Sequence, residues 1–474
     1  MIILGTNSIK DTGFDVANSV RFNSGSSDYL NRTPDSQSTN KFTWSAWIKR
    51  SKLSSFEVMW NERPDDNNFT QAYWESGSPV DSLSFQSYKS GSYHYDFKTN
   101  RLFRDPSAWY HIIFILDTTL GTQADRIKIY VNGVRETSFH TSTNNISQND
   151  TLSVNSNTSN NLKLGSNGSS GFFNGYMCEV VYVSNNALAH TDLGEFDEDS
   201  GIWKPINVSG LTFDTAGYYL DFEDSAALGD DVSGNGNDFT VNNLTAIDQS
   251  TDTPTTNFCT MNALDLYFTN DTLSEGNLLV TNGANYGFPI STFGLSSGKW
   301  YFECQTSSWT SGDLAVGISA RGSDALGDEF SNNTSGSIGY GFRSNGGVYG
   351  GGVALVAADG YTTGSGAHII GMAVNLDDNK LAFSVNGTWQ GSTDPGAGTT
   401  NMLSIQASST NDTGVYFIAL SGANSGAQTM NANFGSPAFS ISSGNADANG
   451  HGNFEYAVPS GYFALCTKNL AGNS

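Results

Sequence analysis

The chain has 474 residues and a formal net charge of −24, and only 14% of its residues are Asp, Glu, Lys or Arg. Such acidity, without any cluster of Lys and Arg, argues against nucleic acid and anionic membrane surfaces as partners. The 52 glycines and the scarcity of charged helix formers favour short strands joined by turns, and the length suits two large β-sandwiches.

Residues 1–18 show little periodicity and are expected to form an N-terminal arm. Their apolar run, Ile2–Leu4, is too short for a signal peptide, and no later stretch reaches the roughly 18 apolar residues of a membrane span. We therefore expect the chain to be made in a cytoplasm and to reach any exterior as part of an assembly.

Two clear strand patterns follow in the first half of the chain. Residues 42–48 place Phe, Trp, Ala and Ile on one face and mostly polar residues on the other, the period of two that a half-buried strand requires. Residues 109–117 are apolar at both parities and β-branched at the centre. This second pattern predicts a strand that is covered on both sides.

A hairpin and two more strands are expected next. Residues 126–136 alternate and contain Asn132-Gly133, a pair that favours a type I′ turn because both residues need positive φ. Residues 141–160 are rich in Asn, Ser and Thr and are expected to form a loop. Further strands are expected at 162–165 and 176–183.

In their order, these motifs resemble the laminin-G-like jelly rolls of the concanavalin A-like type. The resemblance covers residues 19–245 and is carried by the segments FTWSAWI, WYHI, IYVNG, LKLGSN and NGYMCEVVYVSNNAL. It implies a sandwich of two antiparallel sheets, the fold of concanavalin A-like lectins and glucanases.

The chain between the two halves looks like a joint. Strand patterns at 218–222 and 239–241 enclose the turn-dense run GDDVSGNGND, and an extended polar segment with Pro254 near its middle follows. We expect residues 246–289 to be a connector, with the second domain at 290–474.

The second domain shows short strand patterns at regular spacing and another hairpin pair, Asn386-Gly387. Its GKWYFE, GI, GYGF and LAFSVNG segments resemble those of SPRY domains in their order, over residues 290–467. The resemblance implies a second sandwich. The predicted fold class is therefore all-β, with two antiparallel jelly-roll β-sandwiches in tandem.

The succession of these parts is similar to that in structural proteins of tailed bacteriophages, particularly marine ones. It consists of a laminin-G-like sandwich, an SGNGND joint, a DTPTTNF connector and a SPRY-like sandwich, and the segments RFNSGSSDYLNRTP and GEFDEDSGIWKP add to the likeness. The resemblance implies a protein of the virion surface, in a tail fibre, an appendage or a capsid decoration.

The most enzyme-like segment is EFDED at residues 195–199, within an expected short helical turn at 188–205. It resembles the E-x-D-x-E strand of laminarinase-type glycoside hydrolases, whose acid and nucleophile lie about 5 Å apart on one strand face. Here Asp199 stands in place of the second Glu, and the flanking residues do not alternate like a strand. A solvated acidic turn is therefore the favoured interpretation.

One loop has the residue types of a metal site. Asp231, Ser233, Asn235 and Asn237 alternate like the first half of a calcium loop. The twelfth position is Asn242, so the bidentate Glu is missing, and a neutral Asx-rich turn is favoured over a weakly held Ca²⁺. No other cofactor is expected, because the cysteines and histidines show no ligand spacing.

Aromatic residues in turn-rich segments are the candidates for ligand binding, because ring faces suit the C–H surfaces of sugars and loops vary without disturbing a core. Packing is the alternative role for each of them. The candidates are Trp74, Tyr93, Tyr95, Trp309, Tyr340, Tyr349, Tyr361 and Trp389.

Together these observations predict a non-enzymatic virion protein of a tailed phage that binds a host-surface glycan or receptor. Other virion proteins are the expected partners, and a homo-oligomer is compatible with the sequence. Two alternatives stay open: an architectural cement or connector of the virion, and a polysaccharide depolymerase built on the jelly roll.

Overall fold

A computed structural model describes residues 13–473 except 38, 156–160, 267–270, 284–287, 310–313, 321–329, 332–338, 362–363, 365, 412 and 423–427. The chain divides into two compact units, Thr12–Thr255 (the first unit) and Thr256–Ser474 (the second unit). Both consist of antiparallel sheets, which confirms the all-β fold class. No helix among the described residues is long and apolar enough to cross a membrane.

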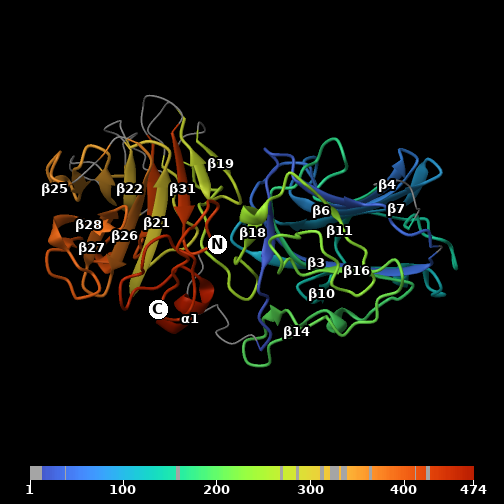
Figure 1. Cartoon of the computed structure of the whole chain (residues 1–474). Coiled ribbons are helices and arrows are strands. Elements are labelled where there is room, and N and C mark those ends of the chain that lie inside the picture. Colours follow the sequence, from blue (N-terminus) through green and yellow to red (C-terminus); the bar gives the residue numbers. More distant parts are fainter. Residues whose placement is uncertain are drawn as a thin grey trace. The chain divides into compact units, whose positions relative to one another are not determined.

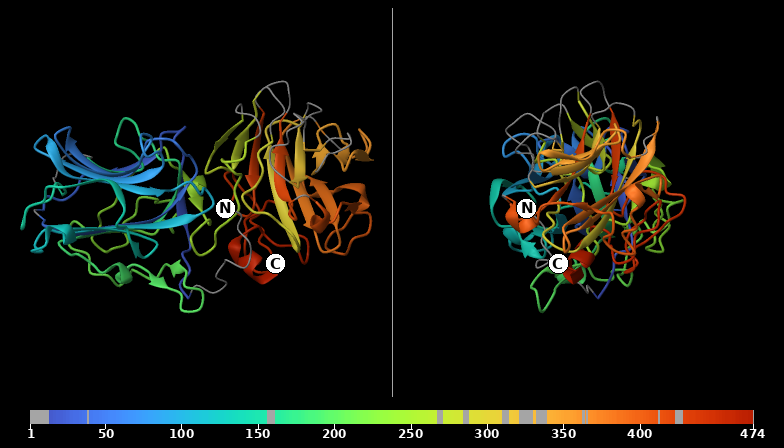
Figure 2. Two further views of the ribbon diagram at one scale, coloured as in Figure 1. Left: turned by 180° about the vertical axis from the view of Figure 1, so that it is seen from behind. Right: turned by 90° about the vertical axis from the view of Figure 1, so that its left-hand side faces the viewer.

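The first unit contains two antiparallel sheets that face each other as two layers (Figures 1 and 2). The first sheet has the order β10-β9-β8-β3-β13-β1-β18, and β16 pairs with β13. Its strands are β1 (Ser19–Phe22), β3 (Lys41–Arg50), β8 (Trp109–Asp117), β9 (Ile127–Val131), β10 (Val134–Arg135), β13 (Gly175–Ser184), β16 (Tyr218–Leu220) and β18 (Gln249–Ser250).

The second sheet has the order β11-β7-β6-β5-β4-β12-β2-β17. Residues 141–144 belong to its edge strand, so the expected loop at 141–160 is wrong there, because their backbone pairs with β7. The strands are β2 (Tyr29–Arg32), β4 (Glu57–Asp65), β5 (Asn68–Trp74), β6 (Ser82–Lys89), β7 (Ser92–Leu102), β11 (Phe139–Asn144), β12 (Leu162–Leu164) and β17 (Thr240–Asn242).

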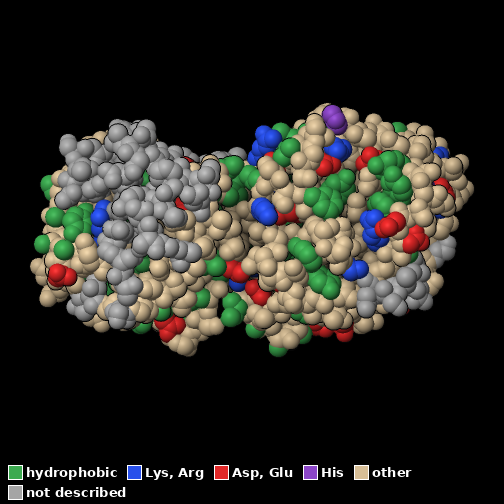
Figure 3. Space-filling view, turned by 90° about the horizontal axis from the view of Figure 1, so that it is seen from above, with side chains coloured by type: hydrophobic (Ala, Val, Ile, Leu, Met, Phe, Trp, Pro, Cys, Tyr) green, Lys and Arg blue, Asp and Glu red, His purple; other side chains and the backbone are tan. Residues whose placement is uncertain are grey.

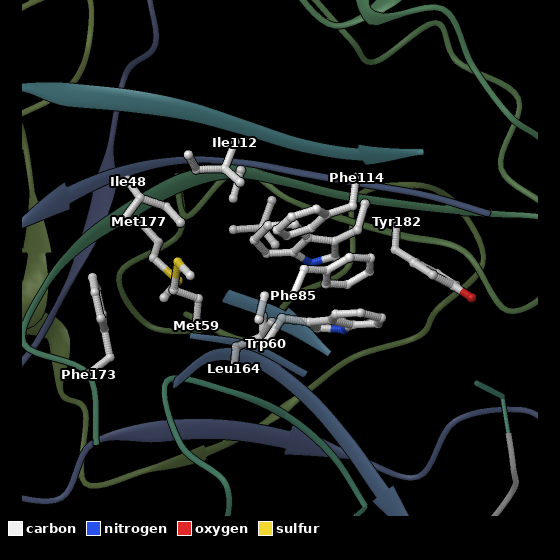
Figure 4. Packing of buried hydrophobic residues seen from close by; sticks show 14 of the residues in the cluster. Ile48, Met59, Trp60, Phe85, Ile112, Phe114, Leu164, Phe173, Met177 and Tyr182 are labelled. Carbon is white, nitrogen blue, oxygen red and sulfur yellow. The ribbon is translucent and has the colours of Figure 1, made fainter. Parts of the chain in front are cut away.

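Large apolar side chains fill the space between these sheets (Figure 4). The four apolar side chains that alternate along β3 are fully buried there, as the period of two predicts. The rings of Phe85 and Phe114, one from each sheet, stack with centroids 3.9 Å apart. Burial of each such side chain stabilises the fold by about 1.5–3 kcal/mol, which holds the two layers together.

β8 confirms the prediction of a strand covered on both sides. Ile112 and Phe114 point into the core between the sheets, whereas Ile113 and Ile115 belong to a second apolar cluster that includes Trp203. The segment after β13 supplies this cover and contains η3 (His190–Asp192), β14 (Glu195–Phe196) and β15 (Trp203–Lys204). The apolar clusters of the described residues thus cover both faces of the first sheet but only the inner face of the second.

The start and the end of the first unit are joined by hydrogen bonds. The Val16 amide donates to Thr255 Oγ1 at 3.0 Å, and the Ser19 hydroxyl donates to the Asp252 carbonyl at 2.6 Å. Residues 13–18 of the expected arm therefore belong to the first unit, and residues 1–12 lie outside the described residues.

The expectation of a separate connector at 246–289 is wrong, because its residues are divided between the two units. β18 pairs with β1 in the first unit, next to η4 (Ala246–Asp248). β19 (Thr272–Ser274) and β20 (Leu279–Thr281) pair with each other, and β20 also pairs with β31 of the second unit. A polar segment with little apolar pattern can still add short strands to a sheet, since backbone pairing needs no particular side chain.

The second unit has a larger sheet in the order β19-β20-β31-β21-β26-β27-β28, with β29 paired to β27, and a smaller sheet in the order β25-β24-β23-β22-β30. The C-terminal segment covers the outer side of the larger sheet through Phe454 and Tyr462, and the chain ends in α1 (Thr467–Asn473). The remaining strands are β21 (Lys299–Thr306), β22 (Ala315–Ser319), β23 (Gly339–Arg343), β24 (Val348–Gly350), β25 (Val353–Val356), β26 (His368–Asn375), β27 (Lys380–Val385), β28 (Thr388–Trp389), β29 (Leu403–Ser404), β30 (Phe417–Ser421) and β31 (Thr429–Asn433).

Both predicted Asn-Gly hairpin turns are confirmed. Asn132 and Gly133 have φ of 48° and 74°, and Asn386 and Gly387 have φ of 47° and 77°. Two consecutive positive φ angles are the signature of a type I′ turn, whose twist matches that of the strands it joins.

Candidate functional site

The outer face of the second sheet carries one continuous row of polar side chains, because side chains at matching register positions share a face. Their neighbours along the strands, among them Trp60 and Phe85, point into the core. The eight members of this polar row, one from each strand, are Thr240, Asn31, Lys163, Asn61, Gln71, Gln86, Asp96 and Thr143.

The middle of the polar row has unused hydrogen-bonding capacity. The Gln71 amide donates to Gln86 Oε1 at 3.0 Å. Four buried atoms, Asn61 Nδ2, Asn61 Oδ1, Gln71 Oε1 and Asp96 Oδ1, have no hydrogen-bond partner among the described residues. Buried polar atoms are nearly always satisfied in folded proteins, so these four atoms have capacity for hydrogen bonds to bound water or to an external partner.

Aromatic side chains flank the polar row on both sides. On one side, Phe69 and Tyr88 each lie two residues from the row along their strands, and their rings stack with centroids 4.9 Å apart. Tyr93 packs edge-on against Tyr88 at 4.4 Å. In the other direction, Phe56 and Tyr73 are 5.1 Å apart. The polar row therefore forms a floor between two aromatic walls. Phe56, Tyr88 and Tyr93 keep exposed surface, whereas Phe69 and Tyr73 are buried beside them.

The aromatic side of the site is most accessible at the β6–β7 hairpin, and Thr240 is exposed at the far end of the row. Tyr93 is 39% exposed, and Tyr88, Asp96 and Thr143 are half-buried, whereas Gln71 and Gln86 lie almost entirely below the surface. Figure 3 looks onto the sheet that lies uppermost in Figure 1 and shows hydrophobic side chains in separate patches, with charged side chains between them. A ligand would meet the rings first and the amides beneath them.

The charges around the site are paired. Lys98 Nζ lies 2.6 Å from Glu75 Oε2, and the Arg63 guanidinium lies 3.0 Å from Asp66 Oδ1 and 4.3 Å from the centre of the Phe69 ring. Burial raises the pKa of Asp96, and the nearby Lys98 partly opposes that shift.

Lys163 lies next to Asn61 in the row, and burial lowers the pKa of its amine. Desolvation disfavours the charged form of a carboxylate and of an amine alike. Burial therefore favours the neutral form of both groups on the floor of the site.

The prediction of ligand binding is wrong for four of the eight aromatic residues, because their rings are buried. Trp74 is 0% and Tyr95 is 1% exposed, both in the core between the sheets of the first unit. Trp309 and Tyr340, at 1% and 7%, belong to the core of the second unit. A ring without an exposed face offers no surface to a sugar.

The other predicted aromatics have exposed surface. Tyr93 belongs to the site described above. Tyr349, Tyr361 and Trp389 are half-buried in the second unit: the Arg343 guanidinium lies 4.8 Å from the centre of the Tyr349 ring, and Trp389 packs near the Tyr301 ring. Their role in binding stays a prediction.

Several residues of the site were missed from the sequence alone, notably Gln71, Gln86 and Tyr88. A signal was present, since NFTQAYW and SLSFQSYK each alternate between core residues and residues of the outer face. Only the register of β5 against β6 shows that Gln71 lies opposite Gln86.

The loop with the residue types of a calcium site is held by its own hydrogen bonds. The Asp231 carboxylate accepts from the amides of Tyr219 and Asn237, both at 2.8 Å, and from the amide and hydroxyl of Ser233. Oδ1 of Asn237 accepts a hydrogen bond from the Arg32 guanidinium. A metal ligand would have to turn this oxygen towards the metal ion instead.

Asn235 points its amide nitrogen at backbone carbonyls, so the predicted metal-binding set of Asp231, Ser233, Asn235 and Asn237 fits an Asx turn better than a cation site. The described residues contain no group of three or more His, Cys, Asp or Glu placed to hold a metal ion.

The acidic segment at 195–199 lies on an exposed two-stranded ribbon, where β14 pairs with β15. Lys204 Nζ lies 3.3 Å from Glu195 Oε1 and 3.5 Å from Asp197 Oδ2. This ribbon belongs to the segment that covers the first sheet, so its carboxylates do not share a face with the polar row.

Two hollows also lie within the first unit. One, of about 330 Å³, lies between β9 of the first sheet and the edge strand β11 of the second, and is lined by Phe97, Ile127, Ile129 and Phe139 with a polar rim. The other, of about 470 Å³, is wide open and lies at the tips of the β4–β5 and β6–β7 hairpins. Neither contains the open polar atoms of the row.

Residues 24–193 match the Laminin_G_3 family model, described as the concanavalin A-like lectin/glucanases superfamily. This assigns the segment to a concanavalin A-like lectin/glucanase domain, and it contains every position of the polar row except Thr240. No curated protein matches the sequence.

Solved structures match parts of the chain at low similarity. The SPRY domain of human HERC1 is 13% identical over 36% of this chain and 96% of its own, with a TM-score of 0.28. A SAP-like pentraxin from Limulus polyphemus is 14% identical over 37% and 80%, with a TM-score of 0.27. Domain 4 of AbnA, a GH43 extracellular arabinanase from Geobacillus stearothermophilus solved with arabinotriose, is 24% identical over 34% and 68%, with a TM-score of 0.26.

Proposed function

We propose that the first unit binds carbohydrate on the outer face of its second sheet, without catalysis. The observation that carries this proposal is the set of four buried polar atoms without hydrogen-bond partners among the described residues, between two aromatic walls. The assignment of residues 24–193 to a concanavalin A-like lectin/glucanase domain supports it.

Sugar chemistry matches both components of the site. Hydroxyl groups donate and accept hydrogen bonds, as the amides of Asn61, Gln71 and Gln86 do, and the C–H faces of a pyranose pack on rings such as Tyr93. A sheet face is also a rigid support, so little side-chain and loop entropy would be lost on binding.

The test is a glycan array with the full chain, followed by calorimetric titration of any glycan that binds. Tyr93→Ala and Gln86→Ala should each weaken binding by about fivefold or more, since an aromatic contact or a satisfied hydrogen bond contributes roughly 1 kcal/mol or more. Tyr456→Ala removes a half-buried tyrosine from the second unit that is not among the candidate binding residues, and it is the matched control. An array without any bound glycan, or equal affinities in all variants, would refute the proposal.

We further propose that the chain is a structural component of a tailed-phage particle, placed on its surface as part of a tail fibre, an appendage or a capsid decoration. The motif order described for the sequence supports this placement, and so does the strongly acidic, soluble-type composition. Other virion proteins would be its partners and a host-surface glycan its target, and many copies per particle would multiply a weak affinity. Mass spectrometry and immunogold labelling of purified particles test this, and absence of the chain from them would end it.

A further inference from the structure

We infer that the ligand of the polar row is a neutral oligosaccharide whose chain runs across the strands of the second sheet. This inference rests on the carbohydrate-binding function proposed above and narrows it to a class of glycan and to one direction of binding.

The open hydrogen-bonding atoms determine which groups a ligand must offer. Three of them are acceptors, Asn61 Oδ1, Gln71 Oε1 and Asp96 Oδ1, and one is a donor, Asn61 Nδ2. Sugar hydroxyls supply donors and acceptors, whereas carboxylate and sulfate groups supply acceptors alone. An acidic sugar over the row would therefore bring acceptors to acceptors.

The charges beside the row lead to the same conclusion. Lys98 is paired with Glu75 at 2.6 Å and Arg63 with Asp66 at 3.0 Å, so these two basic side chains already have carboxylate partners. Lys163, the basic member of the row itself, lies next to Asn61 on β12, and burial lowers the pKa of its amine. An acidic glycan would have to displace those carboxylates and approach Asp96. The formal net charge of −24 repels polyanions from the chain as a whole.

The geometry of the face sets the direction of the chain. The polar row crosses the strands, and the wall formed by Phe69, Tyr88 and Tyr93 runs beside it over β5, β6 and β7. Because neighbouring strands lie about 4.8 Å apart, the part of the row from Asn61 on β4 to Asp96 on β7 spans roughly 14 Å. An oligosaccharide along the row would have the rings at its flank and the amides beneath it.

The experiment titrates the full chain with neutral oligosaccharides of increasing length, and with uronate-containing and sulfated oligosaccharides, at low and at high salt. We expect neutral chains to bind at least about tenfold more tightly than acidic ones, with affinity that rises with length and does not change with salt. Acidic chains that bind more tightly, with affinity that falls steeply in salt, would overturn the inference while leaving carbohydrate binding intact. If no glycan of either kind binds, the proposed function itself fails, and the inference with it.

The direction is tested by two threonines on the same face of β11. Thr143 is in register with Asp96 and belongs to the polar row, whereas Thr141 is in register with Lys98, outside it. Thr143→Ala should reduce the gain in affinity from lengthening the chain, and Thr141→Ala should not. Equal effects of the two substitutions would contradict a chain that follows the row.

Discussion

Lys49 and Asp252 form an ion pair in the interior of the first unit: Nζ lies 2.7 Å from Oδ2, and both side chains are 1% exposed. The Trp109 indole also donates to Asp252 Oδ1, at 3.1 Å. Because Asp252→Ala would leave a buried amine without this carboxylate, we expect it to lower the free energy of unfolding by about 3–5 kcal/mol. Urea denaturation followed by tryptophan fluorescence measures the loss.

Two variants serve as controls for this effect. Lys49→Met combined with Asp252→Leu removes both charges and should recover much of the loss. Asp117→Asn breaks the more exposed pair with Lys41, 3.3 Å apart, and should cost less than about 1 kcal/mol. Equal losses for Asp252→Ala and Asp117→Asn would show that burial of the Lys49 pair has no special weight.

His111 is expected to make the fold sensitive to acid. The Trp203 indole donates to Nδ1 at 2.8 Å, so Nε2 carries the proton and faces Ser45 Oγ at 2.7 Å. Burial lowers the pKa of His111 to about 3, against about 6.5 in an unfolded chain. The stability that the neutral ring contributes is present above pH 6.5 and is lost as the pH falls from 6.5 towards 3.

Within that window, unfolding of the wild-type chain should take up about one more proton than unfolding of His111→Gln. Denaturation curves at several pH values give the two slopes. His140→Gln changes an exposed histidine of the same unit and should leave the wild-type slope unchanged. Parallel pH profiles for wild type and His111→Gln would contradict the prediction.

Glu179 acts in the opposite direction. It lies on a bulge of β13 and accepts a hydrogen bond from the Tyr219 hydroxyl at 2.7 Å. Burial raises the pKa of Glu179 to about 7 from an ordinary 4.5. Its contribution to stability is therefore complete below pH 4.5 and is lost as the pH rises through 7.

Glu179→Gln keeps an acceptor for Tyr219 without a charge, so stability should no longer decline over that range. Thermal unfolding between pH 4.5 and pH 8 measures the difference, and Glu198→Gln at an exposed position is the control. A decline that is unchanged in Glu179→Gln would exclude this carboxyl as its source.

Gly133 combines a positive φ with a close aromatic contact. Its φ is 74°, and an added Cβ would lie 2.2 Å from Cε3 of Trp203. Gly133→Ala should therefore cost about 1–2 kcal/mol for the left-handed backbone and a further 1–3 kcal/mol for displacement of the indole. Gly201→Ala isolates the backbone part, because Gly201 has φ of 69° and open space around it. Urea denaturation of the two variants should show the larger loss for Gly133→Ala, and similar losses would mean that Trp203 yields without cost.

Calcium is expected to leave the stability of the first unit unchanged. The Asp231 carboxylate already accepts four hydrogen bonds from protein donors, so a cation would have to break them in order to bind. Melting temperatures in excess calcium and in excess chelator should therefore agree. A saturable rise of the melting temperature with calcium would restore the metal-site hypothesis.

The strands that alternate in the sequence were predictable because alternation reports directly on burial. This holds for the core-facing side of β3, for β8 with its two covered faces, and for both Asn-Gly hairpins. The expected half-burial of β3 is wrong, because its polar face, with Ser45 and Lys49, is buried as well. Trp74 and Tyr95 were misjudged because their segments are rich in turn residues, although both side chains point inward from strands.

The polar row itself could not be predicted. It requires the register of eight strands that are scattered between residues 29 and 242, and short-range patterns do not determine which strands pair. Gln71 and Gln86 face each other because β5 and β6 form a hairpin, but Asn31, Lys163 and Asn61 are brought together by pairing between segments far apart in the chain.

The hydrogen bond between the Val16 amide and Thr255 Oγ1 means that the polypeptide leaves the first unit where it enters it. A body with adjacent entry and exit can be grafted into a surface loop of an unrelated scaffold without forcing that scaffold apart. The first unit is therefore suited to insertion into different scaffold proteins, because its own two ends are joined by hydrogen bonds.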